Sequence, residues 1–178
     1  MLGRSPQGEA SATIALLTPE FGLVRARAQG VRKPGAKLAP ALQTFAECEA
    51  ILVRGKDAWR LSGAMLTKHF APTLEKKSRE RAGRIASLAL RLMRGESSDA
   101  APFHALRGLL VALPALTEDE QDAAECLAAL RLLSALGFDT GELPGADDAY
   151  DRASLAPLLA DRKTYVARVN RGIAASGL

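Results

Sequence analysis

The sequence predicts an α+β protein, with a small antiparallel β-barrel followed by an all-helical domain. The hydrophobic period is about two residues in the first third of the chain and about 3.6 residues after Leu66. Charge divides in the same way. Residues 1–84 hold 15 Lys and Arg against 7 Asp and Glu (+8), and the remainder holds 9 against 13 (−4). We therefore expect two domains, residues 1–66 and 67–178, with the basic one facing a polyanion.

Short strands account for the first domain. The clearest alternates along residues 23–29, placing Val24, Ala26 and Ala28 on one face and polar side chains on the other. The predicted strands are residues 13–17, 23–29, 45–53 and 58–63, and Gly-containing turns join the first two and the last two. Such strands are best closed into a barrel, because an open sheet exposes its edges.

Helical patterning fills the second domain. Ile85, Leu88, Ala89 and Leu92 share one face, and a polar break at residues 95–101 follows. Further helices are expected along residues 103–113, from Thr117 to Gly137, in a short segment at 155–160, and from 162 to about 174.

The third of these helices is the best specified. Thr117 and Glu120 form a capping box at its start, and Gly137 supplies the stop. Phe138 can then fold back on Leu133.

A run of basic residues without acids lies between Phe21 and Pro40. Its members are Arg25, Arg27, Arg32, Lys33 and Lys37. The first two share a strand face, and the others follow in a segment broken by Gly and Pro, so a basic loop extends from a basic strand. This pattern favours contact with a phosphate backbone without base readout. The alternative is a solvated charged face, although solubility alone favours mixed signs.

A second basic patch, from Lys76 to Arg84, lies where the barrel passes into the helices, and its candidate DNA-binding residues are Lys76, Lys77 and Arg79. It either extends the same groove or forms a solvated first helical turn. Three aromatic residues of the first domain also have two interpretations. Trp59, Phe45 and Phe21 stack bases or fill the barrel core.

Signs of catalysis are missing. His69 and His104 have no acid cluster near them, and the sequence holds neither a P-loop nor a GxGxxG motif. Cys48 and Cys126 are expected to be reduced and packed, and Asp147, Asp148 and Asp151 to be solvated loop acids. We predict a protein that is not an enzyme, binds no cofactor or metal, spans no membrane and lies in the cytoplasm, associated with the nucleoid.

The stretch from Leu16 to Lys33, LLTPEFGLVRARAQGVRK, followed by Leu42-Gln43-Thr44-Phe45, resembles the N-terminal domain of the bacterial DNA repair protein RecO family. Gly8-Glu9 and the segment from Leu130 to Phe138 also match this family. The resemblance implies an OB-fold for the barrel. It implies binding of single- and double-stranded DNA and annealing of complementary strands. It also implies loading of the recombinase RecA, with RecR and the C-terminal tail of the single-strand-binding protein as partners.

On matching positions, Arg25, Arg27, Arg32 and Lys33 correspond to the family's basic strand and loop. Two departures stand out. Little of the family's first strand precedes Gly8, which predicts an incomplete or differently started barrel. Residues 139–153 contain no cysteine, so the four-cysteine zinc module of many members is absent.

Three functions therefore remain open. The first is a DNA-binding recombination mediator in DNA repair, which responds to DNA damage without catalysing a reaction. The second is a protein-binding adaptor that recognises an acidic peptide and binds DNA weakly or not at all. The third is an RNA-binding module, since backbone contacts do not distinguish the sugars unless the 2′-hydroxyl is read.

Overall fold

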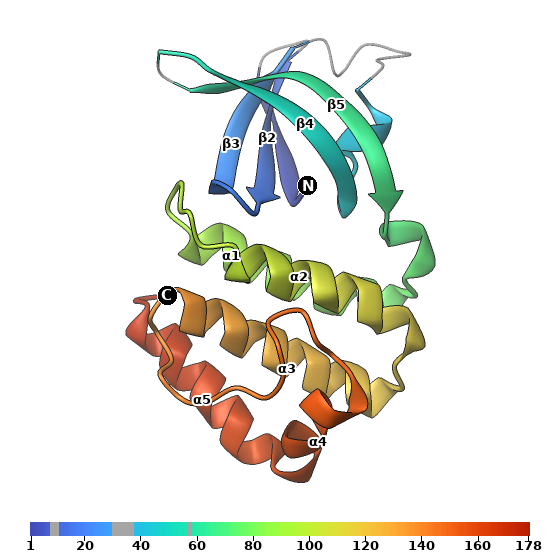
Figure 1. Cartoon of the computed structure of the whole chain (residues 1–178), viewed down its shortest axis with the longest axis vertical. Coiled ribbons are helices and arrows are strands. Elements are labelled where there is room, and N and C mark those ends of the chain that lie inside the picture. Colours follow the sequence, from blue (N-terminus) through green and yellow to red (C-terminus); the bar gives the residue numbers. More distant parts are fainter. Residues whose placement is uncertain (8–10, 30–37, 57) are drawn as a thin grey trace.

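The computed structural model describes residues 1–7, 11–29, 38–56 and 58–178, and there it shows a sheet followed by a layered set of helices (Figure 1). The strands are β1 (Gly3–Gln7), β2 (Ser11–Thr18), β3 (Gly22–Ala28), β4 (Ala46–Arg54) and β5 (Trp59–His69). The helices are α1 (Lys76–Leu92), α2 (Ala101–Ala112), α3 (Glu118–Ala135), α4 (Arg152–Ala160) and α5 (Arg162–Ala175). Short 3-10 turns lie at Pro40–Leu42, Ala71–Thr73 and Leu113–Ala115. The α+β prediction is confirmed.

All five strands form one sheet in the order β1-β2-β3-β5-β4. The pairs β1–β2, β2–β3 and β4–β5 are antiparallel, whereas β3 and β5 pair in parallel. Ala26, Arg27 and Ala28 of β3 lie opposite Trp59, Arg60 and Leu61 of β5. This parallel pairing joins the first hairpin to the second, and it is the contact that the alternation pattern alone does not reveal.

The expected closed barrel is not formed in the part of the chain that the structure describes. There β1 and β4 are edge strands, and they meet only near Met1. The Met1 nitrogen donates to the Ala46 carbonyl at 2.7 Å, and the Phe45 amide donates to the Met1 carbonyl at 3.0 Å. Two register shifts in the β4–β5 ladder bend this hairpin. Figure 1 shows it arching over β2 and β3, so that the sheet stays open on its β1–β4 side.

Most strand predictions agree with the structure to within a few residues, with two exceptions. β5 continues to His69, past residue 66, where the sequence places the domain boundary. The other is β1, because the sequence predicts little of a first strand before Gly8, whereas Gly3–Gln7 forms one. Its residues after Gly3 are exposed and carry no apolar alternation, so it exists only through its pairing with β2.

The turn between β2 and β3 is tightly held. Gly22 has φ +61°, a conformation that suits glycine. The Thr18 hydroxyl accepts a hydrogen bond from the Phe21 amide at 3.0 Å and donates to the Gly22 carbonyl at 3.3 Å. The Ser97 amide donates to the Phe21 carbonyl at 3.0 Å, which ties the turn to the segment between α1 and α2. The backbone at Phe21 is therefore fixed from both sides.

Two apolar clusters organise the molecule. One fills the concave side of the sheet and consists of Ala12, Ile14, Leu16, Val24, Ala26, Ala28, Leu42 and Leu61. The other runs through the helices and reaches into the sheet, where it includes Leu17, Leu23, Phe45 and Phe70. Because these residues of the sheet belong to the apolar cluster of the helices, the sheet packs directly on the helices.

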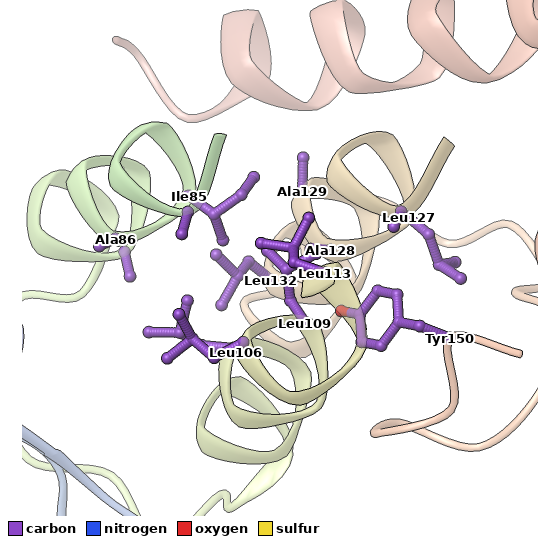
Figure 2. Packing of buried hydrophobic residues seen from close by; sticks show 14 of the residues in the cluster. Ile85, Ala86, Leu106, Leu109, Leu113, Leu127, Ala128, Ala129, Leu132 and Tyr150 are labelled. Atoms are coloured by element: carbon purple, nitrogen blue, oxygen red, sulfur yellow. The ribbon is translucent and has the colours of Figure 1, made fainter. Parts of the chain in front are cut away.

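The helices stack in layers beneath the sheet, with α1 and α2 next to it and α3 between them and the pair α4 and α5 (Figure 1). Figure 2 shows isoleucine, leucine and alanine side chains of α1, α2 and α3 packed together, with Tyr150 beside them. The Tyr150 hydroxyl is buried and donates to the Ala105 carbonyl at 2.7 Å. A buried hydroxyl with its partner present adds specificity to an otherwise apolar core.

The predicted ends of α3 are confirmed. Thr117 and Glu120 form the capping box, with the Thr117 amide donating to the Glu120 carboxylate at 2.9 Å. At the other end Gly137 has φ +79°, and the Phe138 amide donates to the Leu133 carbonyl at 2.8 Å. This is the left-handed glycine termination expected from the sequence.

Candidate nucleic-acid interface

The convex face of β3 carries the arginines that the alternation predicted. Val24, Ala26 and Ala28 are buried on the concave side, and Arg25 and Arg27 are exposed on the other. The prediction of one core face and one guanidinium face is confirmed. An exposed strand presents such side chains at a regular spacing along its length.

Arg60 joins this row from the neighbouring strand. It lies opposite Arg27 in the parallel β3–β5 register and is exposed. Paired strands are about 4.8 Å apart, so the two guanidinium groups emerge side by side. Gln7 positions one of them, since its side-chain oxygen accepts from Arg27 Nε at 3.1 Å. Like charges placed opposite each other repel, and a shared anion would remove that repulsion.

Arg25 also contacts the helical layer. Its guanidinium donates to the Leu90 carbonyl at 3.3 Å, in the last turn of α1. Carbonyls at the end of a helix lack intrahelical partners and carry partial negative charge, so a cation there is favourable. Arg25 therefore also helps to hold the sheet on the helical layer.

The candidate residues of the second basic patch, Lys76, Lys77 and Arg79, lie at the opposite end of α1 from Leu90. With a rise of about 1.5 Å per residue, they are separated from Arg25 by most of the helix, roughly 20 Å. The last arginines of the patch, Arg81 and Arg84, pair with Asp122 and Glu125. Lys77 pairs with Glu118 at 2.6 Å, and Arg79 donates to the Ala71 and Leu74 carbonyls at 3.2 and 3.0 Å. Lys76 is exposed. Among the described residues, these three side chains thus lie apart from Arg25 and Arg27.

Three of the predicted site residues, Arg32, Lys33 and Lys37, lie outside the described residues, as do Gly8 and Glu9. The sequence does not predict Arg60 as a site residue. It appears there only as one arginine in a short predicted strand, and its position next to Arg27 depends on the parallel pairing of β5 with β3. Its place on the polar side of an alternating strand was the one signal that could have drawn attention to it.

The aromatic residues divide between the two interpretations. Phe45 is 4% exposed and belongs to the core, whereas Phe21 is 41% exposed at the β2–β3 turn. Trp59 is half-buried, and its ring centroid lies 5.5 Å from that of Phe21. Both Phe21 and Trp59 line a cleft of about 830 Å³ between the open side of the sheet and α2.

Groups for chemical catalysis do not gather within the described ranges. His69 lies on β5 and His104 on α2, and no three His, Cys, Asp or Glu side chains among the described residues are placed to hold a metal ion. Both cysteines are free and half-buried. Burial raises the pKa of Cys126 to about 11, which keeps it a thiol rather than a reactive thiolate near neutral pH.

No helix in the described part of the chain is both long enough and apolar enough to cross a bilayer.

Comparison with known proteins agrees with this architecture. Residues 1–70 match the family model described as "Recombination protein O N terminal". The chain is 32% identical over 114 residues to the DNA repair protein RecO of Dehalococcoides mccartyi, a match that covers 64% of this chain and 45% of that protein. It is 33% identical over 133 residues to the RecO of Heliobacterium modesticaldum, covering 74% and 47% of the two chains.

The fold and the site therefore define a class of protein in which a basic, open OB-like sheet packs on a helical domain. The chain is a member of the RecO family, and residues 1–70 form its RecO N-terminal domain. The matches span about half the length of these relatives.

Proposed function

We propose that this protein is a DNA-binding recombination mediator in DNA repair and acts without catalysing a chemical reaction. The observation that supports this most directly is the pair of guanidinium groups, Arg27 and Arg60, in register on the convex face, with Arg25 beside them. Within the described residues neither Arg27 nor Arg60 forms an ion pair with a carboxylate, and two neighbouring guanidinium groups suit the phosphates of a DNA backbone. The similarity to proteins named DNA repair protein RecO points the same way.

Binding through phosphates makes the interaction independent of base sequence and usable for single and double strands alike. Annealing of complementary strands then follows from charge screening and proximity, because each bound strand loses part of its repulsion for the other. The helical domain would dock RecR and the tail of the single-strand-binding protein, which brings the recombinase to the strand. No cofactor enters this scheme.

The test is fluorescence anisotropy of a labelled single strand titrated with the full chain over a salt series. The double variant Arg27→Gln/Arg60→Gln should weaken binding to all sequences alike. It should also make the log–log salt slope shallower by about 1.4, from about 0.7 per phosphate contact on a single strand. Arg171→Gln, an exposed arginine of α5, is the matched control and should bind as the wild type does. An unchanged slope in the double variant would remove this face from the proposal.

An adaptor that recognises an acidic peptide is the second candidate, and a groove in the helical domain favours it. The groove has a volume of about 430 Å³ and lies between α1, α3 and α5. Its apolar lining includes Ile85, Leu88 and Val166, and Arg84, Arg91 and Arg162 border it. Arg84 and Arg162 already pair with acids, Glu125 at 2.6 Å and Asp122 at 3.0 Å, whereas Arg91 is exposed in the last turn of α1.

Competition between a labelled acidic peptide with an apolar C-terminus and a DNA single strand separates the two candidates. Preference for the peptide at physiological salt, lost in Arg91→Gln, would put the adaptor first. Preference for DNA, lost in the Arg27/Arg60 variant, would support the mediator. The same titration with an RNA strand of equal sequence tests the third possibility, since equal affinity would show that the sugar is not read.

A further inference from the structure

An aromatic corner lies at one end of the cleft beneath the sheet. It combines Phe21 of the β2–β3 turn, Arg54 at the end of β4 and Trp59 at the start of β5. The Phe21 and Trp59 rings are 5.5 Å apart and tilted by 46°, and the Arg54 guanidinium lies 5.1 Å from the centroid of the Trp59 ring. The β2–β3 turn and the β4–β5 hairpin, which are distant in sequence, thus bring two aromatic rings and a planar cation together.

One carboxylate fixes this corner. Glu96, between α1 and α2, accepts from the Trp59 indole nitrogen at 2.8 Å and from both terminal nitrogens of Arg54 at 3.3 and 3.4 Å. It also forms an isolated β-bridge with Gly22, next to Phe21. The orientation of the indole is therefore set before any ligand arrives, and little side-chain freedom is left to lose on binding.

Phe21 is held with its ring partly in solvent. Its backbone is fixed by Thr18 and Ser97, as described above, and a side chain at Gly22 would meet the Ser97 backbone at 3.1 Å. Phe21 is 41% exposed on this rigid turn, and both Phe21 and Trp59 line the cleft, so part of the ring is accessible to a ligand without a change of the backbone.

Charge at the corner argues for a neutral, flat ligand. Arg54 is neutralised by Glu96, and Glu20, next to Phe21, is exposed. A phosphate gains nothing from this balance, whereas a nucleobase stacks on aromatic rings and guanidinium planes whatever its sequence. The phosphate-binding arginines are close by, because Trp59 immediately precedes Arg60 on β5 and lies opposite Ala26, between Arg25 and Arg27.

We propose that Phe21 and Trp59, with Arg54, form a stacking platform for the bases of single-stranded DNA. This inference rests on the proposed DNA-binding function and extends it, because it names the residues that contact the bases of an unpaired strand. Trp59 and Arg60 point to opposite sides of the sheet, so the DNA strand passes from the arginines to the platform around the start of β5. A flexible single strand can make that turn, and its bases are free to stack. A duplex is stiff and keeps its bases covered, so it uses only the arginine face.

The test uses the full chain, whose single tryptophan is Trp59, so intrinsic tryptophan emission reports on this site alone. The probes are an oligodeoxythymidylate, an abasic oligonucleotide of equal length with the same phosphates, and a duplex. We expect the oligodeoxythymidylate to quench the emission and to bind about fivefold or more tightly than the abasic strand, as stacking of even one base would give. Neither the abasic strand nor the duplex should quench it.

Phe21→Ala should weaken binding of the oligodeoxythymidylate by a similar factor and leave both the abasic affinity and the salt slope unchanged. Val111→Ala is the matched control, since Val111 is 47% exposed on α2 and should alter neither. Equal affinity for the two single strands, with no quenching, would overturn the platform while salt-dependent binding kept the mediator proposal intact. Absence of binding to every probe at low salt would overturn both. The comparison of probes on the wild-type chain requires no variant to fold.

Discussion

Arg60 offers a prediction in which stability and DNA binding move in opposite directions. It lies opposite Arg27 on paired strands about 4.8 Å apart. Two unit charges about 6 Å apart in water repel by about 0.7 kcal/mol, and salt reduces this to a few tenths. Arg60→Gln should therefore raise the free energy of unfolding slightly, by roughly 0.2–0.7 kcal/mol at low salt. The same change should remove one phosphate contact and make the salt slope shallower by about 0.7.

Urea denaturation at low and moderate salt measures the first effect, and anisotropy of a labelled single strand measures the second. Arg60→Lys keeps the charge and is the matched control, so it should leave the salt slope near that of the wild type. Once Arg27 is changed to Gln, a second change at Arg60 should no longer stabilise the chain, because the repulsion has already gone. A loss of more than about 1 kcal/mol in Arg60→Gln, with unchanged DNA binding, would show that Arg60 supports the fold and would refute this reasoning.

Two further predictions concern the helical domain. In Gly108→Ala, the new Cβ would lie 2.8 Å from the carbonyl carbon of Asp148, which is backbone and cannot rotate away. We expect a loss of about 1–3 kcal/mol in urea denaturation, despite the better helix propensity of Ala, and unchanged stability would contradict the close packing of α2 on this loop. The pKa of Asp122 is affected most by burial, which raises it, but hydrogen bonds and charge from Arg81 and Arg162 outweigh burial and leave it below the ordinary value of 3.8. Its stabilising contribution is thus complete above about pH 4 and is lost as the pH falls through the lowered pKa. The cost of Asp122→Asn, about 1.5–3 kcal/mol at neutral pH, should shrink in acid, and a pH-independent difference would exclude this origin.

Local patterns in the sequence predicted the elements that depend on near neighbours. The alternation along residues 23–29 predicted the buried and exposed faces of β3, because successive side chains of a strand point to opposite sides. Thr117, Glu120 and Gly137 marked both ends of α3, because caps satisfy backbone groups within a few residues. The family resemblance added the OB-like fold, and the comparison with known proteins confirmed the family.

Features that depend on distant pairing were not accessible in the same way. The parallel register of β3 and β5 brings Arg60 beside Arg27, and the length of α1 places Lys76, Lys77 and Arg79 away from Arg25 and Arg27. The sheet stayed open where closure was expected, since the bent β4–β5 hairpin meets the first strand only near Met1.

The sequence by itself therefore determined the α+β class, the basic strand face, the helix ends and the family. Tertiary structure alone decided which arginines stand side by side and that Phe21 stays exposed while Phe45 is buried. The physical reason is the range of the interactions. Periodicity and capping act within a turn or two of chain, whereas strand register and the packing of sheet on helix join residues that are tens of positions apart, and a local pattern carries no record of those partners.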